Sequence, residues 1–544
     1  MVRDLRRLAD TRFDVLVVGA GIYGAAAAWD ATQRGLSVAL IDRGDFGGGT
    51  SFHNHKTLHG GLRSLQAMNV RQMRRFIRER RALVRIAPHL VRPLPFVVPT
   101  TASLTRNALV LRVALAVNDL AAWDRSEGIA DPDLHLPNGA LISKAEALRL
   151  NPMVDPGTVA GGAVWYDYQM TNADRMTFSF ALSAAGAGAT AANHVAAESM
   201  LVERGRVTGA RLRDAESGEA FDVRASAVVN AAGAWAPELV SSLPGGSSAV
   251  PALRLSRAMN VILRQPASSH ACGGVVDGRF LFLVPWRTVS ILGTSHDAHR
   301  GSASALSVSA ADLEAFLAEG RRAFPRAALS TADVRLVHRG LLPMVSGEGN
   351  RVTLLRESTV VDHAAHGAPG LVSIHGVRYT TARHTAAEAV DAVFRVLGHS
   401  RPPACQTDRT PLEGGAIARV ADLIAAAQRE HPDVPGDVLA RLVRTYGTNY
   451  VRLLRLAESA PQLAVPLGQA CDVTGVEIAY AAREEMARTL ADALIRRTEA
   501  GSAGHPGRDA VSQAANVMAA ERGWDEARRL AELADVEAFY RLPG

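Results

Sequence analysis

The sequence predicts an α/β fold in which a doubly wound domain is interrupted by a second domain and followed by an all-α domain. Three observations support this prediction. A glycine-rich turn near the N-terminus joins a short apolar strand to a helix. Two later apolar strands also end in turns of small residues, as expected when one sheet is assembled from separated segments. Beyond residue 416, apolar residues recur with helical spacing almost to the C-terminus.

The glycine-rich turn lies inside a complete β-α-β unit. Residues 13–18 form a β-branched, apolar run typical of a buried strand, and the sequence G-A-G-I-Y-G follows at 19–24. Residues 25–34 then predict a helix, and residues 37–41 predict a second strand that ends at Asp42. A lone glycine motif is weak evidence, but the strand, the helix and the terminal acid together predict a dinucleotide-binding unit of the Rossmann type.

Four residues of this unit have a physical role in the prediction. Gly19 permits the tight turn, Gly21 lets the backbone approach a pyrophosphate, and Gly24 lets the helix pack on the strand. The anion would lie at the helix N-terminus, where free N–H groups and the helix dipole favour negative charge. Asp42 would accept a hydrogen bond from an adenosine ribose hydroxyl.

Two further segments continue this domain. Residues 225–229 form a strand followed by a small-residue turn at Gly233, and residues 371–376 form another strand followed by a helix over 382–397. Because the pieces are separated, a second domain is expected between them. We predict the dinucleotide domain at about 11–89, 166–244 and 341–400, the inserted domain at about 90–165 and 245–340, and the helical domain at 401–544.

The composition is that of a folded, globular chain of two or three domains. Of 544 residues, 48% are hydrophobic and 21% charged, which excludes disorder as a description of the whole protein. Lysine and arginine number 60 against 54 acidic residues, and only Lys56 and Lys144 are lysines. The sequence has no motif for nucleic-acid binding beside this mild basic excess, so binding to nucleic acid is not expected. Three distant cysteines, Cys272, Cys405 and Cys471, predict neither a disulfide framework nor a zinc site.

The sequence favours a cytoplasmic location. Residues 1–11 are charged and polar and lack the apolar core of a secretion signal. No stretch reaches the roughly 18 unbroken apolar residues of a transmembrane helix. The most apolar segment, 107–123, is interrupted by Arg112 and Asp119. We interpret it as a buried or interface helix, and peripheral contact with the inner face of the membrane is the alternative.

A longer motif follows the β-α-β unit. Residues 49–65 read G-T-S-F-H-N-H-K-T-L-H-G-G-L-R-S-L. This segment resembles the T-S-x-x-x-S-K-x-x-H-G-G-x-R-Y-L motif of the FAD-dependent glycerol-3-phosphate dehydrogenase family. Further segments resemble that family in the same order along nearly the whole chain: 87–96, 229–235, 285–286 with 293–295, 477–480, 496–498 and 523–525.

The resemblance implies an FAD domain interleaved with an α+β substrate domain, then a helical C-terminal domain. It also implies oxidation of glycerol 3-phosphate, or a close polyol phosphate, to dihydroxyacetone phosphate by hydride transfer to flavin N5. Quinone or oxygen would be the electron acceptor; a homodimer is a further hypothesis, and no metal is expected. By the motif match, the catalytic residues would be His59, Arg356 and Arg378. The cofactor-binding residues would be Gly19, Gly21, Gly24, Asp42, Thr50, Ser51, Lys56, His59, Gly60, Gly61, Gly233, Gly376 and Thr380.

Four positions depart from the family pattern at the substrate site. Ser64 replaces a tyrosine, Asn260 a histidine, Leu342 an arginine and Arg378 a lysine. An apolar side chain at 342 cannot replace a bidentate phosphate ligand. Two alternatives therefore stay open: a flavin dehydrogenase or oxidase of a non-phosphorylated hydroxy acid, amine or other alcohol, and a flavoprotein that no small alcohol reduces.

Other groups of residues receive simpler interpretations. Arg257 or Arg339 could supply the missing phosphate contact. The loop histidines 53, 55 and 59 have no acidic neighbour in sequence, and a metal is not expected there. The arginines of 71–85 predict a solvated helix face. Residues 165–167 are expected to pack the sheet, and His375 and His384 flank the third flavin segment.

Overall fold

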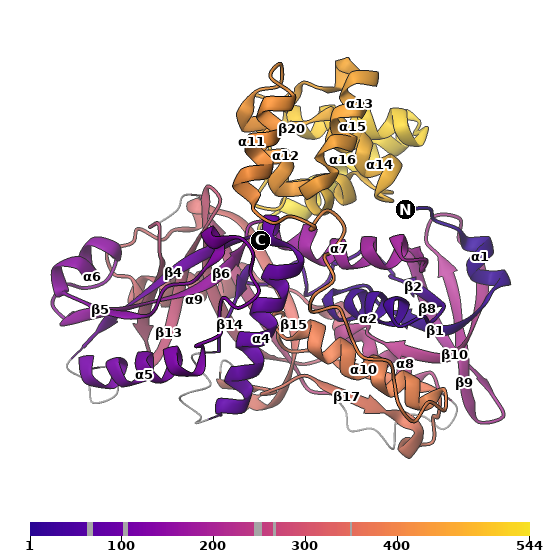
Figure 1. The fold of residues 1–544 in the computed structure, drawn as a ribbon, viewed down its shortest axis with the longest axis horizontal. Coiled ribbons are helices and arrows are strands. Elements are labelled where there is room, and N and C mark those ends of the chain that lie inside the picture. The colour runs from indigo at the N-terminus through magenta and orange to yellow at the C-terminus, as the bar shows by residue number, and fades with distance from the viewer. Residues whose placement is uncertain (62–68, 102–106, 244–252, 265–267, 349–350) are drawn as a thin grey trace.

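The structure is a computed structural model that describes residues 1–61, 69–101, 107–243, 253–264, 268–348 and 351–544. Two sheets with their helices lie side by side, and a helical domain lies on top of them (Figure 1). The doubly wound sheet, the inserted sheet-based domain and the helical C-terminal domain predicted from the sequence are present, but the last is not all-α, since it also holds a two-stranded sheet within residues 466–474.

The first sheet is the doubly wound one, with the strand order β17-β18-β10-β1-β2-β7. β1 lies parallel between β10 and β2, and its apolar, nearly fully buried residues explain the continuous hydrophobic run in the sequence. Helices α2, α7 and α10 cover one face of this sheet. The strands are β1 (Arg12–Val18), β2 (Val38–Ile41), β7 (Thr190–Ala192), β10 (Ala220–Asn230), β17 (Thr359–Asp362) and β18 (Leu371–His375), with the hairpin β8 (Val195–Glu203) and β9 (Arg206–Asp214) added to β10. The helices are α1 (Leu5–Asp10), α2 (Ile22–Gln33), α7 (Ala173–Gly186), α8 (Ala236–Ser241) and α10 (Ala382–Val396).

The second sheet is mostly antiparallel, with the order β16-β15-β11-β14-β13-β12-β4-β6-β3 and β5 beside β6. It extends past the predicted segments, because β6 continues to Met170 and β15 to Glu348. Its strands are β3 (Thr57–Leu58), β4 (Val91–Thr100), β5 (Ala140–Ile142), β6 (Gly161–Met170), β11 (Leu255–Leu263), β12 (Ala271–Val276), β13 (Arg279–Trp286), β14 (Val289–His299), β15 (Val334–Glu348) and β16 (Arg351–Leu354). Its helices are α4 (Val70–Ile86), α5 (Ala108–Ala121), α6 (Lys144–Leu150) and α9 (Ala310–Ala323).

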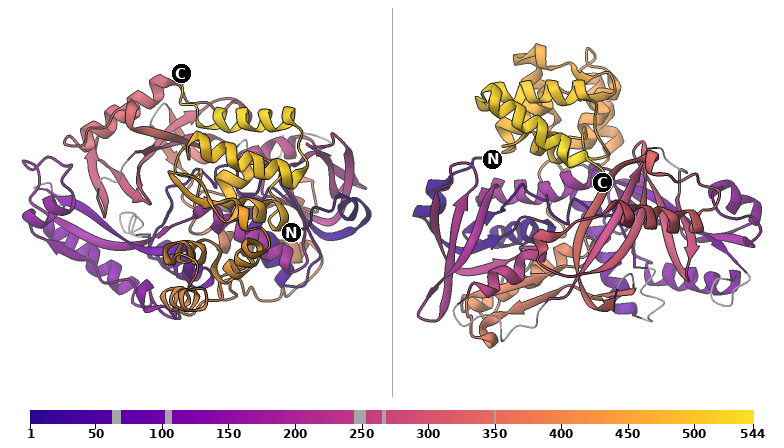
Figure 2. Two further views of the ribbon diagram at one scale, coloured as in Figure 1. Left: turned by 90° about the horizontal axis from the view of Figure 1, so that it is seen from above. Right: turned by 180° about the vertical axis from the view of Figure 1, so that it is seen from behind.

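The C-terminal domain lies over the junction between the two sheets (Figure 2). Its core is continuous with Phe52, Trp286 and Leu336 below it, so the domain is docked through apolar contacts. Thr474 and Glu477 form a capping box that fixes the start of α14. The elements are α11 (Val420–Glu430), α12 (Gly436–Tyr446), α13 (Tyr450–Ser459), β19 (Pro466–Gly468), β20 (Cys471–Thr474), α14 (Gly475–Glu484), a π-helix (Asp492–Arg497), α15 (Arg508–Arg522) and α16 (Glu526–Tyr540).

The most apolar helix, α5, lies on the surface. Leu109, Leu120 and the following Trp123 are 70%, 76% and 74% exposed, and Leu115 is the buried residue of the helix. The prediction of a buried helix is therefore wrong for this chain, although an interface remains compatible with the exposed face. Across the described ranges, we find no helix with the length and apolar character needed to span a membrane.

The arginine-rich helix α4 is not simply a solvated face. Arg80 is buried against Asp167, and Arg74 and Arg81 both pair with Asp124. These acids come from distant segments, which is why the sequence pattern of the helix alone predicted solvent exposure. The prediction of a solvated face is wrong for Arg80, whereas Arg74 and Arg81 are partly exposed and paired.

Candidate active site

The glycine-rich turn has the geometry that a pyrophosphate requires. Gly19 has a φ of +94°, and a Cβ on Gly24 would lie 1.8 Å from the carbonyl oxygen of Gly19. In contrast, among the described residues a Cβ on Gly21 would find only the Ser51 hydroxyl within 4 Å, which leaves space in front of this residue. Helix α2 begins at Ile22 and directs its N-terminus toward that space. The residues present therefore fit a dinucleotide phosphate.

Asp42 follows the last residue of β2, beside this turn. Its carboxylate accepts hydrogen bonds from the N–H of Ala20 (2.6 Å) and of Gly44 (2.9 Å). Burial raises the pKa of Asp42, and the two N–H groups only partly offset this effect. Each oxygen keeps a free acceptor site, as a carboxylate can accept about four hydrogen bonds. The carboxylate is thus fixed in orientation and able to accept from a ribose hydroxyl.

Replacing Asp42 by Ala is expected to raise the dissociation constant of FAD about tenfold or more, because a hydrogen bond to a charged group contributes about 1.5–3 kcal/mol. Titration of the apoprotein with FAD, followed by flavin fluorescence, measures this change. Asp14→Ala is the matched control, since the Asp14 carboxylate accepts from Ser37 at the surface of the same domain. Equal FAD affinity in Asp42→Ala and Asp14→Ala would contradict the ribose role.

The loop after the β-α-β unit ties the two sheets together. Thr50 Oγ1 lies 3.3 Å from both the N and the O of Leu341 on β15, and Ser51 Oγ accepts from the N–H of Ile22 (2.9 Å). Lys56 is fully buried and donates from Nζ to Phe52 O (2.6 Å) and to Asp174 (3.3 Å). Its charge is thus balanced within the protein, and its role in cofactor binding stays a prediction.

His59 lies between an acid and the third flavin segment. Its Nδ1 is 3.6 Å from Asp167 Oδ2, and its backbone N–H donates to Thr380 Oγ1 (3.1 Å). The His59 side chain is 49% exposed, whereas that of Asp167 is buried. Arg80 and the N–H of Gly60 (2.7 Å) also hold Asp167. Asp167 is buried on β6, as expected of a residue that packs the sheet, and its carboxylate also faces His59.

Tyr23, inside the glycine motif, organises the third flavin segment. Its hydroxyl accepts from the N–H groups of Val377 (3.1 Å) and Arg378 (3.0 Å) and lies 2.8 Å from Ser358 Oγ. A Cβ on Gly376 would lie 2.2 Å from the tyrosine ring, so only glycine fits there. The segment before α10 is thus held directly against the N-terminal motif.

Arg356 and Arg378 both lie beside helix α4. Gln72 donates to Arg356 O (2.8 Å), and the Arg378 guanidinium is 5.7 Å from the centre of the Phe76 ring. Burial lowers the pKa of Arg378. Neither guanidinium has a carboxylate partner among the residues that the structure describes. Both cations are therefore free to meet an anion.

The predicted cofactor residue Gly233 (φ +59°) lies just after the end of β10, at the start of a short 3-10 helix (Gly233–Trp235).

One departure from the family pattern, Leu342, lies on a defined face of β15. Leu342 shares a face with Gly340, which packs under Thr50, because strand residues alternate between faces. Arg339 projects from the opposite face by the same rule. Arg257 makes a bidentate pair with Asp312 (2.7 Å to both oxygens). Neither arginine is therefore supported as a substitute for the missing phosphate ligand.

Other predicted positions have structural partners or are not described. Asn260 accepts from Thr294 Oγ1 (2.8 Å) and donates to His53 O (3.0 Å), so it joins the loop to the second sheet. Ser64 and Arg63 lie outside the described residues. His384 pairs with Glu388 on the exposed side of α10.

Sequence reasoning missed Tyr23, Ser358, Arg80 and Asp167 as site residues. Only Tyr23 carried a signal, because it lies within the glycine motif. The contacts of Asp167 with His59 and Arg80 join residues that are far apart in sequence and could not be read from local patterns.

Comparison with known proteins identifies the family. Residues 14–386 match the family described as FAD dependent oxidoreductase, and residues 405–529 match the C-terminal domain of alpha-glycerophosphate oxidase. Glycerol-3-phosphate dehydrogenase 2 of Mycobacterium tuberculosis is 32% identical over 540 residues, which cover 96% of this chain and 87% of that protein. The chain belongs to the FAD-dependent glycerol-3-phosphate dehydrogenase family.

Other members of the glycerol-3-phosphate dehydrogenase family are also similar over nearly the whole chain. The Synechocystis enzyme is 29% identical over 512 residues, covering 91% of this chain and 90% of that protein. The crystal structure of the Bacillus halodurans enzyme complexed with FAD has the same fold, with a TM-score of 0.76, 23% identity, and coverage of 98% of this chain and 95% of that one. The protein is therefore an FAD-dependent oxidoreductase, as the sequence predicts.

Proposed function

We propose that this protein oxidises glycerol 3-phosphate, or a close polyol phosphate, to dihydroxyacetone phosphate. The observation that carries the proposal is the placement of His59, which is half exposed, oriented by Asp167 and tied to the Thr380 segment. A base, two unpaired arginines and an FAD fold are the parts needed to oxidise an anionic alcohol.

His59 is the proposed general base. Asp167 lies on the Nδ1 side of the ring, which leaves Nε2 to accept the proton of the substrate hydroxyl. The imidazolium that results is stabilised by the Asp167 carboxylate, which Arg80 and Gly60 hold in place. FAD, when bound, accepts the hydride from the substrate carbon.

Arg378 and Arg356 are the proposed ligands of the substrate phosphate. Both are unpaired among the described residues and lie beside α4. A guanidinium binds a phosphate through paired N–H groups, which also fixes its orientation. The two side chains would hold the substrate so that its secondary hydroxyl meets His59.

Steady-state oxidation with an artificial electron-accepting dye tests the substrate. The proposal predicts turnover with glycerol 3-phosphate and much weaker turnover with glycerol, because only the former carries the anion that the arginines bind. Equal activity with glycerol and glycerol 3-phosphate would contradict the phosphate role.

A second candidate function is the oxidation of a non-phosphorylated hydroxy acid, amine or other alcohol. Leu342 favours it, because an apolar residue occupies the position of a family phosphate ligand and Arg257 is paired elsewhere. Lactate and glycine in the same assay separate the candidates. If they are oxidised and glycerol 3-phosphate is not, the second function replaces the first.

We further propose that α5 contacts the inner face of the membrane and brings the enzyme to a quinone. The exposed apolar residues of this segment lie beside the exposed Arg112, a combination that suits an anionic lipid surface. They are Leu109, Val110, Val113, Val117, Leu120 and Trp123. Cytoplasmic location is supported by the three free cysteines, and oxygen is the alternative acceptor.

Co-sedimentation with anionic vesicles tests this contact. The double variant Leu109→Ser, Leu120→Ser is expected to lose most of the vesicle binding, whereas Val345→Ser, a control at an exposed apolar residue elsewhere, is expected to keep it. Sedimentation velocity checks the homodimer hypothesis. Vesicle binding that the double variant leaves unchanged, or a dimer that the double variant dissociates, would contradict membrane contact through α5.

A further inference from the structure

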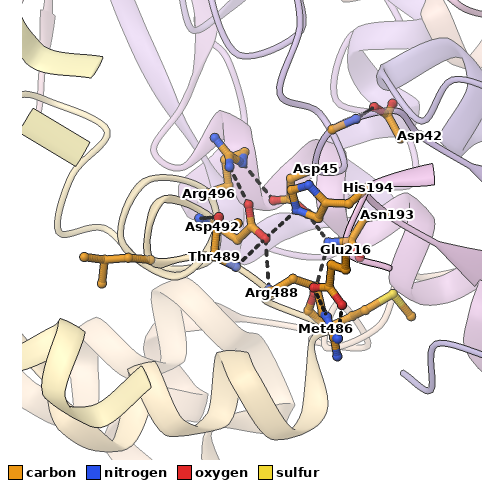
Figure 3. A network of polar contacts seen from close by, with 12 residues as sticks. Asp42, Asp45, Asn193, His194, Glu216, Met486, Arg488, Thr489, Asp492 and Arg496 are labelled. Carbon is orange, nitrogen blue, oxygen red and sulfur yellow. Dashed lines mark hydrogen bonds and ion pairs between the residues drawn. The ribbon is translucent and has the colours of Figure 1, made fainter. Parts of the chain in front are cut away.

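Residues 42–47, which begin at Asp42, are bound by side chains of the C-terminal domain. Asp45 lies three residues after Asp42 and pairs with two arginines of the π-helix (Asp492–Arg497). Arg497 makes a bidentate contact with Asp45 (2.6 and 2.7 Å), and Arg496 Nε donates to the same carboxylate (2.8 Å). The side chains of Asp45 and Arg497 are both fully buried. Figure 3 shows Asp45 and Arg496 facing each other between the two domains.

Both ends of this segment touch the dinucleotide motif. At its start, Asp42 Oδ2 accepts from the N–H of Ala20 (2.6 Å), and at its end the N–H of Gly47 donates to Ala20 O (2.9 Å). Residues 42–47, called the bridge below, therefore connect the glycine-rich turn to Asp45, which lies within them. Asp42 and Asp45 thus lie in one short segment, in which the N–H of Gly44 donates to Asp42 Oδ1 (2.9 Å).

Aromatic packing fixes the middle of the bridge. Phe46 is buried and stacks on Phe178 of α7, with 6.3 Å between the ring centres. The Arg497 guanidinium lies 3.9 Å from the centre of the Phe178 ring. Arg497 thus contacts Asp45 and the ring on which its neighbour stacks, and a buried guanidinium in this position gains both ionic and cation–π stabilisation.

A second contact joins the same parts through the turn between β7 and β8. Asn193 donates to Asp45 Oδ1 (2.8 Å) and to Met486 O (3.0 Å) of the C-terminal domain. The N–H of His194 donates to Gly44 O (2.8 Å), and its Nε2 lies 2.8 Å from Asp492. Figure 3 shows this histidine between the two domains.

The cluster is not built for a metal ion. Ligand atoms of Asp45, His194 and Asp492 lie within 4.8 Å of one another. However, Arg496 occupies both carboxylates and Arg497 occupies Asp45, so cations of the protein already fill the acceptor sites. The arrangement is therefore a contact between domains.

We infer that Arg496 and Arg497 are positioning residues for FAD: the C-terminal domain holds residues 42–47, so that Asp42 is oriented toward the ribose. FAD binding and docking of the C-terminal domain are then coupled, and the coupling is reciprocal. The inference concerns cofactor retention and does not depend on which substrate is oxidised.

Arg496→Met tests the inference, because Arg496 is partly exposed and less needed for folding than the buried Arg497. The FAD dissociation constant, measured by fluorescence on the apoprotein, is expected to rise at least tenfold. Arg483→Met is the matched control, since it breaks a bidentate pair with Glu521 inside the C-terminal domain. Unchanged FAD affinity in Arg496→Met, or an equal loss in Arg483→Met, would overturn the inference.

Limited proteolysis of the full chain gives a second readout. FAD is expected to slow cleavage between residues 401 and 415 in the wild type and much less in Arg496→Met. If FAD protects this linker equally in both proteins, the coupling is absent, even where the affinity has changed.

His194 supplies a pH signature of the same contact. Burial lowers the pKa of His194, whereas Asp492 and Asp45 raise it and Arg496 lowers it, with a net rise above 6.5. Arg488 and Glu216, the next charged groups, pair with each other. Protonated His194 therefore stabilises docking at low pH, and this contribution is lost as the pH rises through its raised pKa.

The FAD dissociation constant of the wild type is thus expected to increase as the pH rises from below 6.5 through the raised pKa of His194. His194→Gln is expected to remove most of this pH dependence. A wild-type affinity that does not change with pH, or an unaltered slope in His194→Gln, would contradict the coupling through this histidine.

Discussion

Replacing His59 by Gln is expected to lower kcat/KM for glycerol 3-phosphate by about 100- to 10,000-fold, the range that a positioned general base contributes. Glutamine keeps the approximate size of the side chain but cannot accept a proton at neutral pH. The reason for a large effect is that Asp167 and Thr380 fix His59 at one place in the site. Stopped-flow measurement of flavin reduction separates this chemical step from binding.

His384→Gln is the matched control for that experiment. His384 also lies next to the third flavin segment, but it pairs with Glu388 on the outer side of α10. Its replacement is expected to leave the rate of flavin reduction unchanged. FAD content is measured in both variants, so that a loss of cofactor is distinguished from a loss of the base. Equal rates in the wild type and His59→Gln would contradict the role of His59 as the base.

Replacing Leu342 by Arg is expected to lower KM for glycerol 3-phosphate by about 10- to 100-fold, since a hydrogen bond between charged groups contributes about 1.5–3 kcal/mol. Leu342 lies on the face of β15 that also carries Gly340 under Thr50, so a guanidinium at 342 would project toward the loop side of the site. Steady-state kinetics with glycerol 3-phosphate and with glycerol measure the effect.

Val345→Arg is the control for Leu342→Arg, because Val345 is exposed on the same strand. It adds the same charge at an exposed position further along the strand and is expected to leave KM unchanged. If both variants lower KM equally, the added positive charge attracts the anionic substrate without binding it at position 342. If Leu342→Arg does not lower KM, the family phosphate position is not used by this protein.

The cofactor half of the site could be predicted from the sequence because its signals are local. The turn around Gly21, the helix after it and the acid at Asp42 are neighbours in one β-α-β unit, and their spacing is fixed by the geometry of strand and helix. The strands predicted at 225–229 and 371–376 are separated along the chain, and this separation predicted that the two domains are interleaved.

The substrate half depended on contacts that cross between segments. Asp167 reaches His59 and Arg80 from β6, and Arg257 is paired with Asp312 from α9. The pairing of Arg497 with Asp45 spans 452 positions. Local periodicity carries no information on such pairs. Nearly all basic residues are arginines, so the sequence could not show which arginines pair with an acid and which do not.

The family pattern has a lysine at two positions, which are Lys56 and Arg378 in this chain, and the surroundings of these two side chains differ. Lys56 is buried with Asp174 and lies 4.7 Å from the Phe52 ring centre and 5.1 Å from that of Trp286. A compact ammonium suits this enclosed site better than a guanidinium. Arg378 has no acidic partner in the described residues, and its planar group can bind a phosphate in a bidentate manner.

The most direct test of the proposed function is anaerobic mixing of the oxidised, FAD-loaded protein with glycerol 3-phosphate. Visible flavin absorbance reports the reaction without any electron acceptor. We expect the absorbance to be bleached, with one substrate molecule consumed and one dihydroxyacetone phosphate formed for each FAD. A flavin that stays oxidised with glycerol 3-phosphate, but is bleached by a chemical reductant, would contradict the proposed function.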